Sequence, residues 1–106
     1  TMTDIDRMGI GPVIELALNT VCSRSDCLHV SFDLDSLDPT VAPGVGTPEP
    51  GGLTYREAHL VMEAIAETGI ISSMDVAEVN PVLDVKNQSA EVAAGIVASC
   101  LGKRIL

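Results

Sequence analysis

Two aspartates separated by a single residue, Asp33 and Asp35, are the residues of this chain best suited to chemistry. They end a stretch in which apolar and polar residues alternate, so both carboxylates project from one face at the end of a predicted strand. Neighbouring carboxylates repel each other unless a cation lies between them, and their oxygens suit Mg²⁺ and Mn²⁺. The pattern indicates a divalent metal site, although solvated loop acids would show the same spacing.

Two other uses of this pattern fit the sequence poorly. A calcium-binding EF-hand loop counted from Asp33 needs an oxygen ligand at its fifth position, where Leu37 stands. A phosphotransferase with an aspartate nucleophile usually has Thr or Val at that position. The Asp38-Pro39 pair and the Pro- and Gly-rich loop that follow fix the backbone after the aspartates, as a rigid metal site requires.

A third acid, Glu78, ends the next predicted strand. The carboxyl ends of parallel strands meet at one edge of a sheet, so Glu78 is expected beside the two aspartates. There it could bind a cationic substrate or orient a ligand, or simply face water. Asp75 is expected on the opposite face. The histidines are weaker candidates: His29 is predicted to be a core or sheet-face residue rather than a ligand, and His59 to lie on a helix surface or at the edge of the core.

The elements that position these acids follow from the spacing of apolar residues. The predicted order is helix, strand, helix, strand and helix, over residues 12–22, 28–34, 55–68, 70–79 and 89–101. A loop with four prolines and four glycines occupies residues 35–52. Thr54 and Glu57 form a capping box before the middle helix. Two strands joined by a helix predict a parallel β-α-β unit, so the fold class is α/β with a parallel sheet.

Composition excludes several functions. Fifteen acidic residues against six basic ones give the 106 residues a net charge of −9, which argues against nucleic acid and anionic membrane surfaces as partners. A hydrophobic content of 46% argues against disorder. No apolar run approaches the length of a membrane span. Cys22, Cys27 and Cys100 lack zinc-site spacing and are predicted to be reduced thiols of a cytoplasmic protein.

Several short motifs together resemble the ureohydrolase family of arginases, agmatinases and formiminoglutamases. They are Ser31-Phe32-Asp33-Leu34-Asp35, Asp38-Pro39, Pro43-Gly44, Gly46-Thr47-Pro48, residues 51–57 and Glu78-Val79-Asn80-Pro81. The likeness covers nearly the whole chain and is strongest to bacterial arginases. It implies a three-layer α/β/α fold with a parallel sheet, of which residues 1–106 are a C-terminal segment of one domain.

The resemblance also implies manganese-dependent hydrolysis of the guanidinium group of L-arginine to ornithine and urea, a reaction of arginine metabolism. Two Mn²⁺ ions would activate a hydroxide that attacks the guanidinium carbon. Asp33 would bridge the two ions, and Asp35 would chelate one of them. Glu78 would pair with the substrate guanidinium, and Thr47 would lie near it. The enzyme would be a homo-oligomer, a trimer or a hexamer.

Part of the family's site has no counterpart in these residues. Two histidines and two aspartates that complete the metal ligands, and the histidine general acid, are missing, so no catalytic residue is assigned. The 106 residues are therefore expected to be inactive alone. Two alternatives stay open. The sequence Pro48-Glu49-Pro50 is more usual in agmatinases, which would make agmatine the substrate. The chain could also be a non-catalytic assembly or regulatory fragment.

Overall fold

The computed structural model describes residues 1–105, and the predicted order of elements is preceded by one further helix, α1. The described residues form four α-helices and two strands: α1 (Met2–Met8), α2 (Ile10–Cys22), β1 (Leu28–Asp33), α3 (Tyr55–Glu67), β2 (Ile71–Ala77) and α4 (Gln88–Cys100). A short 3₁₀ helix, Leu34–Ser36, follows β1 directly. No helix of the described residues has the length and apolar character needed to cross a membrane.

The two strands form a parallel sheet, as predicted. Ser31 pairs with Asp75 and Asp33 pairs with Ala77, so β1 and β2 end at the same edge. The helix α3 connects them and begins with the predicted capping box. The Thr54 amide donates to Glu57 Oε2 at 2.9 Å, and the Glu57 amide donates back to Thr54 Oγ1 at 3.3 Å.

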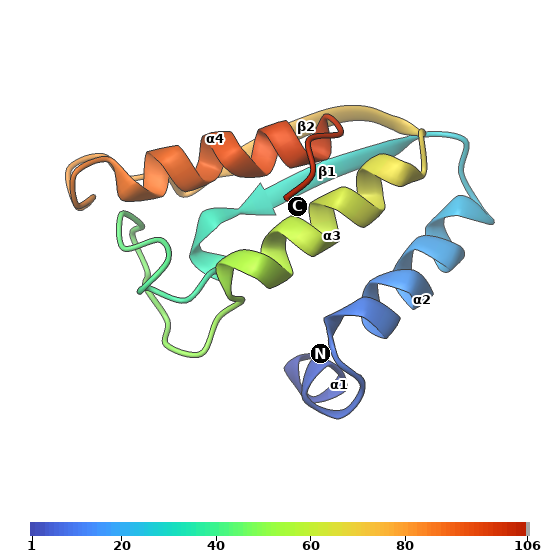
Figure 1. Ribbon diagram of the computed structural model, residues 1–106, viewed down its shortest axis with the longest axis horizontal. Coiled ribbons are helices and arrows are strands. Elements are labelled where there is room, and N and C mark those ends of the chain that lie inside the picture. Colours follow the sequence, from blue (N-terminus) through green and yellow to red (C-terminus); the bar gives the residue numbers. More distant parts are fainter. Residues whose placement is uncertain (106) are drawn as a thin grey trace.

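One face of the sheet is covered by α3 and α4, which lie side by side over it (Figure 1). Val30 and Phe32 of β1 are buried against these helices. The helices contribute small and medium-sized apolar residues to the same core: Ala58, Met62, Ile65, Ala93, Ile96 and Cys100. Burying a side chain as large as Ile96, which is fully enclosed, stabilises the fold by about 1.5–3 kcal/mol.

The opposite face of the sheet is polar. His29, Ser31 and Asp33 alternate with the buried residues of β1 and are exposed. Residues 1–105 therefore provide the sheet and the helical layer on one of its faces. The polar face leads along β1 directly to the pair of aspartates.

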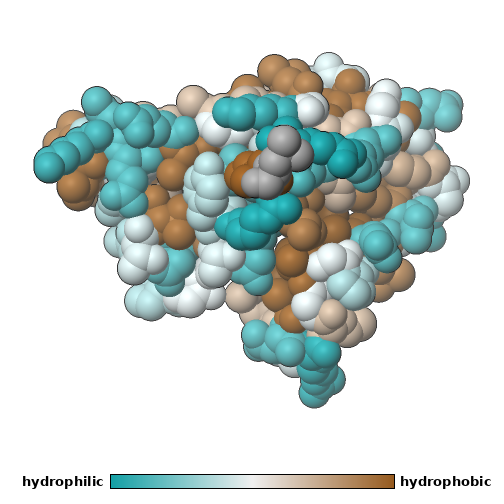
Figure 2. Space-filling view, in the orientation of Figure 1, coloured by the Kyte–Doolittle hydropathy of each residue, from teal (hydrophilic) through white to brown (hydrophobic). Residues whose placement is uncertain are grey.

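The helix α2 packs beside α3 rather than on the sheet (Figure 1). A cleft between these helices is lined by apolar Leu18, Ala64 and Ile70 and by acidic Glu15 and Glu67. Figure 2 shows hydrophobic residues reaching the surface in this hollow. None of the residues of α2 is fully buried, so this helix adds little to the core.

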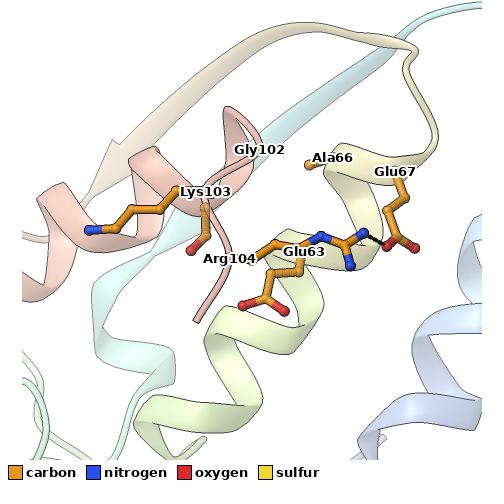
Figure 3. Close-up of a pocket in the computed structure, with 7 residues that line it drawn as sticks. Glu63, Ala66, Glu67, Gly102, Lys103 and Arg104 are labelled. Atoms are coloured by element: carbon orange, nitrogen blue, oxygen red, sulfur yellow. Dashed lines mark hydrogen bonds and ion pairs between the residues drawn. The ribbon is translucent and has the colours of Figure 1, made fainter. Parts of the chain in front are cut away.

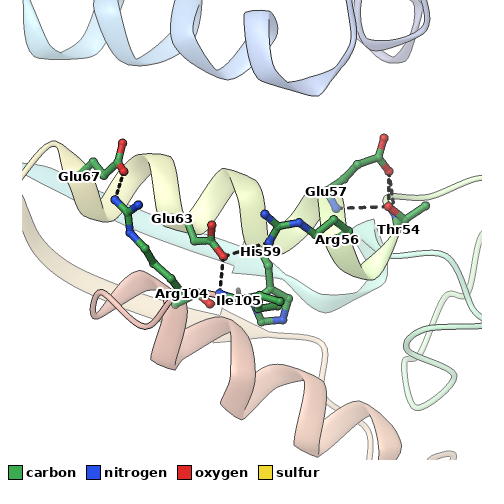
Figure 4. Close-up of polar contacts among 9 residues, drawn as sticks. Thr54, Arg56, Glu57, His59, Glu63, Glu67, Arg104 and Ile105 are labelled. Carbon is green, nitrogen blue, oxygen red and sulfur yellow. Dashed lines mark hydrogen bonds and ion pairs between the residues drawn. The ribbon is translucent and has the colours of Figure 1, made fainter.

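The segment after α4 crosses α3 and is held there by acidic side chains. Arg104 pairs with Glu67 across a shallow pocket (Figure 3). The amide of Ile105 donates to Glu63 Oε1 at 3.0 Å, and Arg56 Nη1 donates to the same oxygen at 3.1 Å (Figure 4). The bond from Ile105 is the main reason why the pKa of Glu63 lies below its ordinary value.

His59 is buried, so its predicted position on a helix surface or at the core edge is wrong. Only 1% of the surface of His59 is exposed, and its Nδ1 lies 2.7 Å from Ser99 Oγ of α4. The ring stacks at a tilt on Tyr55, with centroids 4.3 Å apart. Its Nε2 has no hydrogen-bond partner among the described residues. Burial lowers the pKa of His59, which keeps the imidazole neutral.

Candidate functional site

The aspartate pair lies where β1 turns into the 3₁₀ helix. The amide of Asp35 donates to Asp33 Oδ1 at 3.1 Å, and the Ser36 hydroxyl donates to the carbonyl oxygen of Asp33 at 2.7 Å. These bonds fold the chain back on itself directly after the strand. Asp33 is exposed and Asp35 is half-buried, so both carboxylates can be reached from the sheet edge.

Thr47 reaches this pair from the long loop. Its hydroxyl donates to Asp35 Oδ2 at 2.6 Å, a short bond of the kind that carboxylates form with hydroxyl groups. This contact places Thr47 beside the aspartates, and its predicted place near a substrate guanidinium stays a prediction. The bond also orients Asp35, because it occupies one of the two carboxylate oxygens.

Glu78 approaches the same edge from the end of β2. The strand stops at Ala77, and Glu78 adopts a left-handed backbone conformation with φ of 62°. A Cβ atom added to Gly46 would stand 3.3 Å from Glu78 Oε2, so this carboxylate lies against the residue that precedes Thr47. Left-handed conformations of residues other than Gly, Asn and Asp are strained and often occur at functional sites.

The loop that carries Thr47 is held in place by Asp38 and by a bridge between residues 37 and 53. Asp38 accepts hydrogen bonds from the Thr40 hydroxyl at 2.6 Å, the Thr40 amide at 2.9 Å and the Gly51 amide at 3.0 Å. The bond from the Thr40 hydroxyl, followed by those from the two amides, lowers the pKa of Asp38. Residues 37 and 53 pair as an isolated parallel bridge, so the predicted loop has ordered ends.

The start of α4 also belongs to the site, and sequence reasoning missed it. The amide of Gly44 donates to Ser89 Oγ at 2.7 Å, and the amide of Asn80 donates to the carbonyl oxygen of Gly44 at 2.8 Å. Gly44 and Asn80 were visible in the sequence only as parts of motifs. A hydroxyl residue in the first turn of a predicted helix, such as Ser89, is the sequence signal that could have pointed to this contact.

A second polar cluster occupies the exposed sheet face behind the aspartates. His29 Nε2 lies 3.0 Å from Asp75 Oδ2, and His29 Nδ1 lies 2.8 Å from Ser73 Oγ. The Ser31 hydroxyl donates to Asp75 Oδ1 at 2.7 Å and is the main cause of the lowered pKa of Asp75. The position of His29 on the sheet face is confirmed. Asp75 shares this face with Asp33, so its expected position on the opposite face is wrong.

The aspartate pair fits manganese as part of a larger ligand set. Both donors are carboxylate oxygens, which suit Mn²⁺. Within residues 1–105, Asp33 Oδ2 and Asp35 Oδ1 accept no hydrogen bond, so each aspartate keeps an oxygen available. The same residues contain no group of three or more His, Cys, Asp or Glu side chains that could hold a metal ion.

Comparison with known proteins finds relatives whose similarity extends over the whole of this chain. The family model described as "Arginase family" matches residues 1–102. The arginase of Bacillus subtilis is 52% identical, and its crystal structure superposes with a TM-score of 0.95 over 100% of this chain and 37% of that one. The arginase of Bacillus caldovelox is 49% identical with a TM-score of 0.95, over 100% and 36% of the two chains.

A more distant relative is the agmatine ureohydrolase of Thermoplasma volcanium. It is 30% identical with a TM-score of 0.77, over 92% of this chain and 31% of that one. The chain thus spans about a third of the length of the relatives it matches. The predicted α/β fold with a parallel sheet is confirmed as a part of the arginase fold.

The motifs that suggested ureohydrolases therefore agree with the family model, with the identity to arginases and with the superposition. Members of this family are typically manganese-dependent, which agrees with the carboxylate donors at the sheet edge. The chain belongs to the arginase family.

Proposed function

We propose that this chain forms one part of the active site of an arginase, which hydrolyses L-arginine to ornithine and urea. One observation carries the proposal: a continuous series of contacts joins Asp33, Asp35 and Thr47, with the Glu78 carboxylate against the neighbouring Gly46. Two carboxylates that could hold a metal and a third that could bind a cation would thus act at one sheet edge, as hydrolysis of a guanidinium group requires.

Asp33 and Asp35 would hold the manganese, each through a carboxylate oxygen that accepts no hydrogen bond within residues 1–105. When bound, manganese supplies Lewis-acid activation of the attacking water. The protein's own part is to fix the two carboxylates. The Asp35 amide holds Asp33 Oδ1, and the Thr47 hydroxyl holds Asp35 Oδ2, so the two remaining oxygens have defined positions.

Glu78 would bind the substrate guanidinium. A guanidinium group and a carboxylate form charge-assisted, often paired hydrogen bonds, which give orientation as well as affinity. Glu78 is exposed and its carboxylate lies beside Gly46, so a planar cation can approach it from the solvent. Thr47, next in the chain, would border the same cation and connect it to Asp35.

Arginine is favoured over agmatine as the substrate. The arginases of two Bacillus species share 49% and 52% of their residues with this chain, against 30% for the agmatine ureohydrolase. The sequence Pro48-Glu49-Pro50 is the feature that favours agmatine. We further propose a homo-oligomeric, cytoplasmic protein; three free cysteines support the reducing compartment.

A chimera tests the proposal. In it, residues 1–106 replace the matching segment of Bacillus subtilis arginase, to which the chain is 52% identical. With Mn²⁺ we expect the chimera to release urea from arginine and to prefer arginine to agmatine. The 106-residue chain alone should release none. A preference for agmatine would reverse the substrate assignment.

The alternative of a non-catalytic fragment makes a different prediction for the same experiment. A chimera that folds like the parent enzyme, with an equal melting temperature and elution volume, but releases no urea from either substrate would support that alternative. The matched control is the chimera with Glu78→Gln. Its side chain has the same shape without the charge, so a functional site should lose most of its affinity for arginine.

A further inference from the structure

Gly44 joins three parts of the candidate site through its backbone. Its amide donates to Ser89 Oγ in the first turn of α4 at 2.7 Å, and its carbonyl oxygen accepts from the Asn80 amide at 2.8 Å. Asn80 lies in the turn that carries Glu78, and Gly44 lies in the loop that carries Thr47. A single residue therefore ties both substrate loops to one helix.

Ser89 is an unusual residue for its position. It is completely buried, and its hydroxyl is directed at a backbone amide from a distant part of the chain. Buried amides are almost always paired, and this hydroxyl provides the partner for the buried Gly44. Gln88, the preceding residue, holds the same loop through bonds from its Nε2 to the carbonyl oxygens of Thr40 at 2.8 Å and Val41 at 2.9 Å.

Asp84 fixes the start of α4 against the loop. Its carboxylate accepts from the amides of Val85, Ser89 and Ala90 at 2.8, 3.0 and 3.1 Å. Partial burial raises the pKa of Asp84, but these hydrogen bonds outweigh that effect and hold it below its ordinary value. A Cβ on Gly44 would stand 2.6 Å from Asp84 Cβ, so the loop and Asp84 are in direct contact.

These four residues, Gly44, Asn80, Asp84 and Ser89, form a clamp. Thr47 and Glu78 are exposed and belong to separate loops, which meet where Gly46 lies against Glu78 Oε2 and where the Asn80 amide bonds to the Gly44 carbonyl oxygen. The clamp is what fixes one loop relative to the other. Paired hydrogen bonds to a planar cation depend on this spacing to within a fraction of an ångström.

We propose that Ser89 and Asp84 are positioning residues that set the distance between Glu78 and Thr47 and thereby determine the affinity for the substrate guanidinium. The inference rests on the proposed function, because it assigns the guanidinium to these two side chains. Neither Ser89 nor Asp84 touches the substrate. Their effect passes through Gly44 and the turn at Asn80.

The chain contains a matched control for Ser89. Ser99 lies on the same helix and is equally buried, and its Oγ lies 2.7 Å from His59 Nδ1, whereas the Ser89 side chain bonds to Gly44 and also to Asp84. His59 belongs to α3 and has no contact with the clamp. Ser89→Ala and Ser99→Ala therefore each remove a buried hydroxyl group from this helix, and a general loss of stability should affect both variants.

Two measurements distinguish the variants. In the 106-residue chain, amide hydrogen exchange followed by NMR should accelerate about tenfold or more at Gly44 and Asn80 in Ser89→Ala relative to Ser99→Ala. In the chimera with Mn²⁺, Ser89→Ala should raise KM for arginine about 5- to 50-fold with kcat changed less than about threefold. Ser99→Ala should leave both constants near those of the unsubstituted chimera.

Each outcome has one meaning. Equal kinetic constants for Ser89→Ala and Ser99→Ala in an active chimera overturn the positioning role. If the unsubstituted chimera is folded but inactive, the proposed function fails, and unchanged exchange at Gly44 would separately refute the clamp. Should Ser89→Ala not fold, Asp84→Asn replaces it, since it keeps the side-chain shape and loses one acceptor oxygen. A raised KM supports the inference, and an unchanged KM contradicts it.

Discussion

Gly52 is the position where the smallest added group should have the largest effect on stability. A Cβ there would stand 2.5 Å from the Leu37 carbonyl carbon, 2.6 Å from the Asp38 nitrogen and 2.7 Å from the Ser36 oxygen. All three are backbone atoms, so no rotamer change can relieve the overlap. Ordinary contact begins at 3.4 Å, so Gly52→Ala requires a shift of about 0.9 Å between the two segments.

That shift would break the bridge at the base of the site loop. The Leu53 amide donates to the Ser36 carbonyl at 2.9 Å, and the Asp38 amide donates to the Leu53 carbonyl at 3.0 Å. If the shift of about 0.9 Å lengthens both donor–acceptor distances, neither contact remains a hydrogen bond. Two lost bonds at about 0.5–1.5 kcal/mol each, with some residual strain, give a loss of about 2–4 kcal/mol. For a domain of this size the melting temperature should fall by roughly 10–20 °C.

Equilibrium urea unfolding of the 106-residue chain measures this loss. The control is Gly11→Ala in α2, where an added Cβ meets nothing within 4 Å. Alanine in a helix should leave stability unchanged or raise it by up to about 1 kcal/mol. A midpoint for Gly52→Ala equal to that of Gly11→Ala would refute the reasoning from backbone overlap.

Three further predictions concern the site and the pH dependence of stability. Gly46→Ala should move the flexible Glu78 carboxylate at small cost to stability, below about 0.5 kcal/mol, and raise KM in the chimera several-fold; an unchanged KM would separate Glu78 from substrate binding. The pKa of Asp38 is lower in the folded chain than the ordinary aspartate pKa near 4, which it has in the unfolded chain. Its stabilising effect is therefore complete above about pH 4 and is lost as the pH falls through the pKa of the folded state. The stability advantage over Asp38→Asn, read from urea midpoints, should therefore shrink in acid, and a constant difference would contradict this. The pKa of His59 is also lowered in the folded chain, whereas in the unfolded chain it has the ordinary histidine value of about 6.5. As pH falls below that value, the unfolded chain therefore binds a proton at His59 before the folded chain does. Stability should drop from that pH downward in the native sequence, and His59→Leu should remove this part of the slope.

The regular elements could be predicted because their causes are local. Apolar spacing indicated both strands and the helices of the core, and the Thr54–Glu57 pair marked the true start of α3. The sheet edge followed from the parallel connection, which brought Asp33 and Glu78 to the same region. The alternation of apolar and polar residues along β1 also gave the correct face for His29.

The errors arose where the backbone or a distant partner decides the outcome. Asp75 was placed by counting alternate residues back from Glu78. The strand ends at Ala77 and Glu78 has a positive φ, so Glu78 does not follow the strand's alternation and the count assigned Asp75 to the wrong face. His59 is buried because Ser99 and Tyr55 enclose it, and helix periodicity alone does not reveal that partner on α4. The contact between Gly44 and Ser89 likewise joins a backbone amide to a distant side chain.

The manganese content of the chimera tests the central claim, that Asp33 and Asp35 supply part of a metal site completed by other polypeptide. Metal analysis after gel filtration should find two Mn²⁺ per chimera chain and none on the 106-residue chain alone. Replacing both aspartates by asparagine should abolish the pair of ions while the melting temperature of the metal-free protein stays close to that of the unsubstituted chimera. Two tightly bound ions in that double variant would contradict the account.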